Sequence, residues 1–196
     1  MERDVERDVE RDVERDIKKE QTQTAYTTLY HYFSKMKGDQ VRTSSVPIKD
    51  SMVSAAGSFI AILVISGIAM LLGYPMILGP MGASCLLVFA AHAGPFSQPR
   101  QIFGGHLIAS ITALSIWDIF GRNHLTIGIT LAVILFLMIV MKLVHPPAAA
   151  SGMVAINTQA GWGFLVTIAV TSIVLIIISV LYNNFFKDRQ YPKQWI

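Results

Sequence analysis

Hydrophobic residues fill long runs between residue 52 and residue 182, whereas the first 50 residues and the last ten are rich in charge. An α-helix rises about 1.5 Å per residue, so roughly 20 apolar residues cross the ~30 Å core of a bilayer. Four runs approach that length and are predicted to be full membrane spans: 52–72, 102–121, 125–141 and 161–182. The pattern therefore predicts a polytopic helical membrane domain with two polar ends.

Two further apolar runs are shorter: the run 76–91 is itself interrupted by Gly79-Pro80, and the run 148–156 directly follows Pro146-Pro147. Proline has no backbone N–H and biases the residue before it away from the helical region. We therefore expect the helix that starts at Leu125 to end near Val144 or His145, and Pro147 to lie in the first turn of a new helix. Irregular backbone within a membrane must be buried in protein or line a wet cavity. The stretch from His145 to Gly152 is therefore predicted to be the centre of the molecule.

The two proline segments resemble each other. Residues 80–84 read Pro-Met-Gly-Ala-Ser, and residues 146–151 read Pro-Pro-Ala-Ala-Ala-Ser. Each follows a long span, opens a short helix and leads into another long span, which indicates two structural repeats, about 51–121 and 124–184. The predicted fold is an all-α bundle of four full spans plus two short, proline-broken, re-entrant helices.

The number of crossings has an alternative. If both short helices cross the membrane, there are six spans; the short lengths favour four. Both topologies place the two termini on the same side. The basic residues that flank the spans predict that this side is the cytoplasm: Lys35, Lys37, Arg42, Lys49, Lys187, Arg189 and Lys193.

Three further segments surround the predicted membrane domain of residues 51–184. Residues 1–24 form a charged tail with four Glu-Arg-Asp-Val/Ile repeats, interpreted as a solvated expansion without a direct functional role. Residues 25–50 form an aromatic, amphipathic segment and linker, which could lie in the headgroup region or pack as a short soluble helix. Residues 185–196 are expected to form a cytoplasmic C-terminal tail.

Composition narrows the function further. The chain has 53% hydrophobic and 15% charged residues, which is typical of a membrane protein. Its net charge of +3 is a small basic excess, which we interpret as a signal of membrane topology rather than of nucleic-acid binding. Cys85 is the only cysteine, so the chain has no intrachain disulfide. The histidines lie in different segments without metal-binding spacing, and no Gly-rich phosphate loop precedes a helix. We therefore expect neither an enzyme nor a metal or other cofactor.

Several motifs in order resemble the HPP family of integral membrane proteins. They are His145-Pro146-Pro147 with the alanines that follow, Gly79-Pro80-Met81-Gly82-Ala83-Ser84, Gln98-Pro99-Arg100, Gly104-Gly105-His106 and Gly161-Trp162. The resemblance covers roughly residues 48–182. It implies a four-span membrane protein thought to be a transporter, and the plant plastid members are linked to nitrite transport.

Short helices that open at Pro80 and at Pro146-Pro147 would present unpaired N–H groups and a positive dipole end, which suits a small anion. Small residues there would let a ligand reach the backbone, and the serine hydroxyls could donate. These residues are Gly82, Ser84, Ala148 and Ser151. The alternative is that they only allow close helix packing.

Three ionisable residues complete the candidate pathway. Lys142 and His145 are expected to lie together at the end of one helix, where they could attract an anion or, through His145, relay a proton. The alternative is that Lys142 extends to the membrane surface and His145 caps the helix. His106 should face the bundle interior, as a functional group or as a packed histidine.

The predicted function is a channel or secondary transporter for a small anion, with nitrite as the leading candidate and proton coupling as an option. We expect a homo-oligomer, with a trimer as one candidate, in the lipid bilayer of a bacterial plasma membrane. The alternative is a non-transporting scaffold whose N-terminal tail recruits a partner.

Overall fold

The computed structural model describes residues 17–20, 23–24, 26–27, 30–36 and 47–195. The chain divides into two compact units, Met1–Ser45 and Val46–Ile196. The described residues of the first unit are helical or in a turn, and exposed. The tetrapeptide repeats lie almost entirely outside the described residues, so the predictions for residues 1–16 remain predictions.

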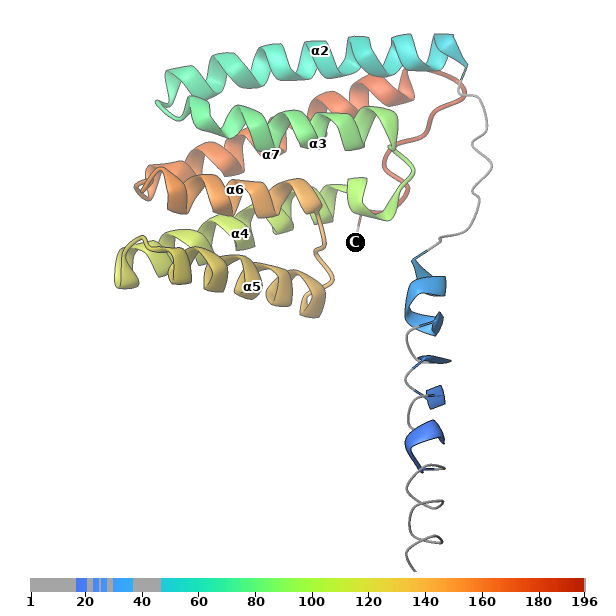
Figure 1. Cartoon of the computed structure of the whole chain (residues 1–196). Helices are drawn as coiled ribbons and strands as arrows, with labels where there is room; N and C mark the ends of the chain where they lie inside the picture. Colours follow the sequence, from blue (N-terminus) through green and yellow to red (C-terminus); the bar gives the residue numbers. More distant parts are fainter. Residues whose placement is uncertain (1–16, 21–22, 25, 28–29, 37–46, 196) are drawn as a thin grey trace, which may run out of the picture. The chain divides into compact units, whose positions relative to one another are not determined.

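The second unit consists of helices, and its described residues form no strand. The elements are α2 (Ile48–Leu71), η1 (Pro75–Ile77), α3 (Leu78–Ala90), η2 (Pro95–Ser97), α4 (Pro99–Phe120), α5 (His124–Val140), α6 (Pro146–Asn157) and α7 (Gly163–Asn184). Successive α-helices run in opposite directions (Figure 1), and the successive pairs α2–α3, α4–α5 and α5–α6 pack against each other. The six apolar runs read from the sequence therefore correspond to six helices.

Membrane-spanning character is strongest in three of these helices. Among the described residues, α2, α4 and α7 are long and apolar enough to cross a bilayer, while the segment Pro75–Ala90 and helix α5 are apolar but shorter. Large apolar side chains on the outer surfaces are exposed, among them Phe59 and Leu63 on α2 and Leu135 and Phe136 on α5. Such surfaces suit contact with lipid, and the chain is an integral membrane protein.

Helices α2 and α5 end in the same way, and this corrects one prediction. After α5 the N–H of Lys142 bonds to the Ile139 carbonyl (3.1 Å), and the N–H of Leu143 bonds to the Met138 carbonyl (2.8 Å). Lys142 has a φ of 56°. This is the Schellman arrangement, and α2 repeats it with Gly73 at a φ of 80°. Helix α5 therefore ends at Val140, several residues before the predicted end near Val144 or His145.

The prolines open helices, although not both at the predicted places. Pro146 and Pro147 are the first two residues of α6, and His145 before them is extended. Pro80, in contrast, lies within the first turn of α3, which begins at Leu78 and follows η1 directly. The predicted interruption at Gly79-Pro80 is therefore wrong, and the chain breaks earlier, in residues 72–74 between the end of α2 at Leu71 and the start of η1.

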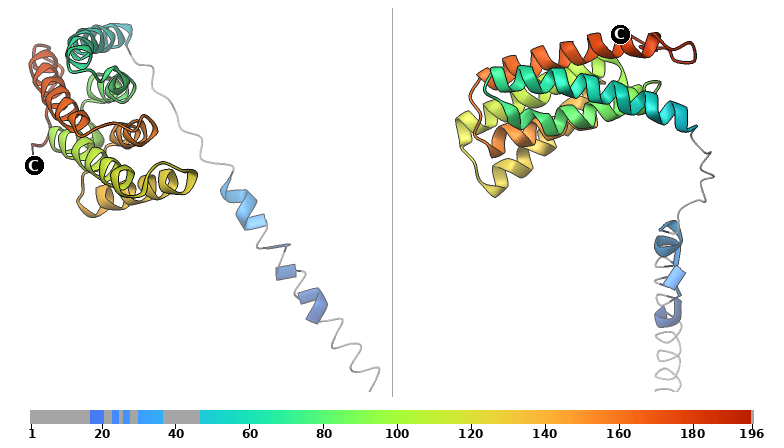
Figure 2. Two further views of the ribbon diagram at one scale, coloured as in Figure 1. Left: turned by 90° about the vertical axis from the view of Figure 1, so that its left-hand side faces the viewer. Right: turned by 90° about the horizontal axis from the view of Figure 1, so that it is seen from above.

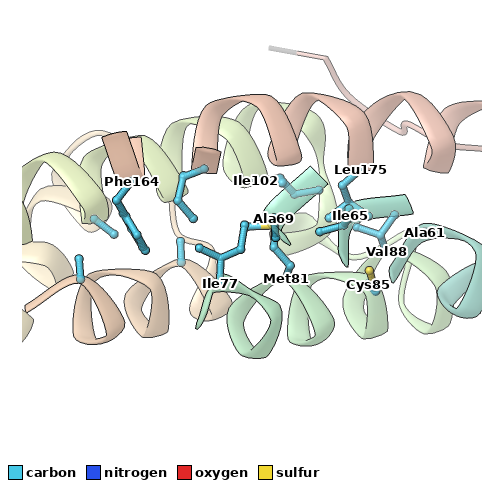
Figure 3. Packing of buried hydrophobic residues seen from close by; sticks show 14 of the residues in the cluster. Ala61, Ile65, Ala69, Ile77, Met81, Cys85, Val88, Ile102, Phe164 and Leu175 are labelled. Carbon is cyan, nitrogen blue, oxygen red and sulfur yellow. The ribbon is translucent and has the colours of Figure 1, made fainter. Parts of the chain in front are cut away.

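Helix α4 is central: it packs against α5, α6 and α7, while α2 packs against α3 and α7, as the end-on view of Figure 2 shows. The core between α2, α3 and α7 contains Ala61, Ile65, Met81, Val88 and Leu175 (Figure 3). Small residues bring the helices together. A Cβ on Gly57 would lie 2.6 Å from ring atoms of both Phe89 and Tyr182.

The C-terminal residues belong to this unit and do not form a separate tail. The Arg189 guanidinium donates to both Asp50 and Ser54 on α2, to the Phe89 carbonyl on α3 and to Asn183 on α7. Its side chain is only 4% exposed. Arg189 therefore fastens the C-terminal segment, residues 185–195, across the ends of three helices.

Candidate functional site

Four polar side chains from four segments meet in the interior of the second unit. They are Ser84 on α3, His106 on α4, His145 in the α5–α6 connection and Ser151 on α6, and each is 0% exposed. We call them the Ser–His cluster. The Ser84 Oγ lies 2.9 Å from both His106 Nε2 and His145 Nε2, and the His106 Nδ1 lies 2.8 Å from the Ser151 Oγ.

The spacing of prolines and serines explains why the two serines meet one histidine. Ser84 lies four residues after Pro80, and Ser151 lies four residues after Pro147. Four residues are about one helical turn, so each serine projects from the second turn of its helix. The two ring nitrogens of His106 bond to these two serines, which come from the two segments that resemble each other in sequence.

Small residues allow the α5–α6 connection to approach α4 closely. A Cβ on Gly105 would lie 2.9 Å from the Cβ of His145 and 3.0 Å from the Leu143 carbonyl oxygen. A Cβ on Gly152 would lie 3.0 Å from the Ala109 carbonyl oxygen. Only glycine fits at these two contacts, so they set the separation of α4 from α6 and from His145.

Counting donors fixes the direction of every hydrogen bond when both rings are neutral. The Phe96 carbonyl, 2.7 Å from the His145 Nδ1, can only accept, so this nitrogen carries the hydrogen. The Nε2 of His145 then accepts from the Ser84 hydroxyl. Ser84 in turn accepts from the Nε2–H of His106, whose Nδ1 accepts from the Ser151 hydroxyl. The cluster is thus a chain of hydrogen bonds with one polarity.

A second acceptor lies beside this chain. The Ser84 Oγ is 3.1 Å from the Pro80 carbonyl oxygen as well as 2.9 Å from the His145 Nε2. A serine hydroxyl has one hydrogen, so it donates fully to only one of them. Ser84 therefore has a choice of acceptor within the buried cluster.

The structure brings together some of the predicted residues and not others. Ser84, His106, His145 and Ser151 form the cluster, Pro80 contributes its carbonyl, and Ala148 is buried next to it. Lys142 is exposed and forms no part of the cluster, because α5 ends before it. Gly82 has no neighbouring segment within 4 Å of its potential Cβ, so it does not allow a close approach within this chain.

The predicted anion site at a free helix N-terminus is also corrected for α6. Pro146 and Pro147 have no N–H, and the N–H of Ala148 already bonds to the His145 carbonyl at 2.9 Å. The first three residues of α6 therefore offer no free backbone donor. Any donors to an anion at this place must come from the side chains.

Sequence reasoning missed one group that bonds to the cluster and one further buried hydroxyl on α4. The Phe96 carbonyl orients His145, but a backbone carbonyl leaves no trace in a sequence. Ser110, one turn after His106 on α4, is fully buried and its hydroxyl has no hydrogen-bond partner among the described residues. Its spacing of four from His106 was the available signal, because residues i and i+4 share a helix face.

No charged side chain bonds to either ring of the cluster within the described part of the chain. The buried charges lie elsewhere, in the Arg189 group near the chain ends. There, partial burial, reinforced by the positive charge of Arg189, lowers the pKa of His92 in the α3–η2 connection. The Ser–His cluster is therefore polar but without a fixed charge of its own.

Comparison with known proteins identifies the family. The family described as "HPP, transmembrane region" matches residues 43–192. A transmembrane protein of Dictyostelium discoideum is 28% identical over 181 residues, which is 84% of this chain and 57% of that protein. A second transmembrane protein of the same organism is 25% identical over 129 residues, 61% of this chain and 45% of that protein.

This chain thus spans about half the length of the curated relatives it matches. No solved structure matches it. The matched region includes every helix of the second unit and all four residues of the Ser–His cluster. The chain belongs to the HPP family of integral membrane proteins.

Proposed function

We propose that this protein is a secondary transporter for a small anion, with nitrite as the leading candidate, and that it is not an enzyme. The observation that carries the proposal is the Ser–His cluster, in which four fully buried polar side chains are joined by hydrogen bonds inside an apolar bundle. Buried polar groups in a membrane are costly, so their presence there favours a functional role.

The chemistry of the cluster suits a small anion. Hydroxyl and imidazole N–H groups donate hydrogen bonds, and an anion accepts them strongly. Ser110, one turn along α4 from His106, supplies a further hydroxyl that has no hydrogen-bond partner in the described part of the chain. These side-chain donors replace the free helix N-terminus as the proposed place of binding.

Burial favours a transporter over an open channel. His106, His145 and both serines are 0% exposed, so a solute reaches them only when helices move apart. Such movement, opening the site to one side at a time, is the usual principle of secondary transporters. We propose that the three-helix halves α2–α4 and α5–α7, which run in opposite directions, are the two repeats that move.

The experiment is nitrite uptake by vesicles that contain the purified full chain. The wild type should take up nitrite, and His145→Ala should reduce the rate by at least about tenfold, because it removes two hydrogen bonds of the cluster. His124→Ala is the matched control, since His124 is exposed at the start of α5. Deletion of residues 1–40 should leave the rate unchanged.

A scaffold function is the alternative, and the same vesicles test it. A scaffold would give no flux of nitrite, nitrate or formate, and its binding of a partner would be lost when residues 1–40 are deleted. Absence of flux for all three anions in folded wild-type protein would refute the transport proposal.

A further inference from the structure

We propose that the Ser–His cluster is a proton-binding site, and that each anion crosses the membrane together with one proton held between His145 and Ser84. This inference rests on the proposed function, because it names the ion that accompanies the anion. It follows from the two acceptors of Ser84, from the direction of the hydrogen bonds in the neutral cluster and from the lack of a charged partner for either ring among the described residues.

In the neutral cluster the Ser84 hydroxyl donates to the Nε2 of His145, and the Pro80 carbonyl, 3.1 Å away, is its second acceptor. The Nδ1 of His145 already carries a hydrogen, which it donates to the Phe96 carbonyl. The Nε2 of His145 is therefore the position on this ring that can take up a proton.

Protonation of this nitrogen costs no hydrogen bond. The new Nε2–H of His145 donates to the Ser84 oxygen, and the Ser84 hydrogen turns to the Pro80 carbonyl. The Ser84 oxygen has two lone pairs and accepts from both imidazole rings. One proton enters from water, no covalent bond of serine breaks, and the same proton leaves when the hydroxyl turns back.

His106 stays neutral in this step. Its Nε2–H continues to donate to Ser84, and its Nδ1 continues to accept from the Ser151 hydroxyl. The two rings are 5.1 Å apart between centroids, and a second positive charge at this distance would be repelled. The cluster therefore takes up only one proton beyond those of its neutral state.

The charge of the protonated ring needs a partner, because an unpaired charge in an apolar interior is strongly unfavourable. The other ionisable side chains on the described surrounding elements, α3 to α7 and their connections, are Cys85 on α3, His92 in the α3–η2 connection, Arg100 and Asp118 on α4, Arg122 in the α4–α5 connection, His124 on α5, Lys142 in the α5–α6 connection and Tyr182 on α7. None of them bonds to either ring in the described part of the chain, and the ion pair of Arg189 with Asp50 lies among the ends of α2, α3 and α7, where its charges are paired with each other. A bound anion would supply the missing negative charge, so one anion and one proton move together without net charge.

Two measurements on wild-type vesicles test the proposal. A trapped pH indicator should record one proton entering for each nitrite. A membrane potential set with potassium and valinomycin should leave the rate unchanged, whereas an inward proton gradient should raise it. Addition of sodium nitrite to the lightly buffered, detergent-solubilised protein should also remove about one proton per chain from solution.

Ser84→Ala should lower the uptake driven by the proton gradient by at least about tenfold, because the protonated ring then loses its acceptor. Ser66→Ala is the matched control, since that hydroxyl bonds to a carbonyl of its own helix α2. Thermal melting of both variants in detergent shows whether they fold.

The two proposals fail in different ways. Nitrite flux that responds to the membrane potential, or that carries no proton, would overturn the coupling proposal and leave transport intact. Unchanged coupling in Ser84→Ala would also overturn it. Absence of flux for every anion tested would instead refute transport itself.

Discussion

At the scale of single residues, one glycine on α3 and one on α4 differ in what surrounds them. Gly105 on α4 faces the Cβ of His145, and a methyl group there would lie 2.9 Å from it. Gly82 on α3 has no atom of another segment within 4 Å. Gly105→Ala should therefore displace His145 and lower the free energy of unfolding by about 1–3 kcal/mol, as overpacking does.

The measurement is thermal melting in detergent together with nitrite uptake, and Gly82→Ala is the control. That control should be neutral or slightly stabilising, because alanine favours a helix over glycine by roughly 0.5–1 kcal/mol. If Gly105→Ala melted and transported like the wild type, the close approach of the α5–α6 connection to α4 would be wrong.

Residue patterns were sufficient to find part of the site. Pro80 with Ser84 and Pro147 with Ser151 share one spacing, and the histidines are ionisable groups in apolar surroundings, so all four cluster residues were candidates. Lys142 was grouped with His145 because α5 was expected to continue further. A lysine in the left-handed region ended the helix instead, and sequence rarely signals such a position, since glycine is the usual residue there.

At the scale of elements, the C-terminal segment reaches the Ser–His cluster through the η2 connection. The Tyr191 hydroxyl donates to the Ser97 carbonyl at 2.8 Å, and the backbone N–H groups of Lys193 and Gln194 donate to the side chain of Gln98. The backbone carbonyl of Phe96, the residue before Ser97, accepts from the Nδ1–H of His145. Three successive residues of the connection thus face the C-terminal segment or the cluster.

Tyr191→Phe should loosen this connection. Burial raises the pKa of Tyr191, so the wild-type hydroxyl remains a donor at physiological pH. Its removal leaves the Ser97 carbonyl without that bond and should cost about 1 kcal/mol of stability. It should also weaken the bond from His145 to Phe96, which ¹⁵N NMR of the histidine ring nitrogens can detect.

Tyr182→Phe is the matched control, because it too removes a bond from tyrosine to a carbonyl, that of Val53 on α2. It should cost similar stability and leave the His145 signals in place. Identical histidine spectra for the wild type and Tyr191→Phe would show that the C-terminal segment does not act on the cluster.

At the scale of the whole molecule, the apolar runs predicted the number and approximate bounds of the helices. The reason is that a segment within lipid must satisfy its own backbone hydrogen bonds, which an α-helix does. The arrangement of the short helices was harder to predict. Helix α6 has 12 residues and is about 18 Å long, well short of the ~30 Å apolar layer. This length alone suggested a re-entrant helix. Only tertiary contacts reveal which helix ends lie at the same end of the bundle.

Those contacts support six crossings over four. The hydrogen bond from Tyr191 to Ser97 places the start of α4 at the same end of the bundle as the C-terminal segment, and Arg189 places the start of α2 there too. The connection at Arg122, after α4, lies at the opposite end of that helix.

We therefore expect Arg100→Cys, made with Cys85→Ser, to be shielded from an impermeant thiol reagent added outside cells, and Arg122→Cys to react. Lys193→Cys, in the C-terminal segment, should behave like position 100, which provides an internal reference whatever the orientation of the protein. Labelling of position 100 on the side opposite to position 193 would restore the four-span arrangement, with α3 and α6 as re-entrant helices.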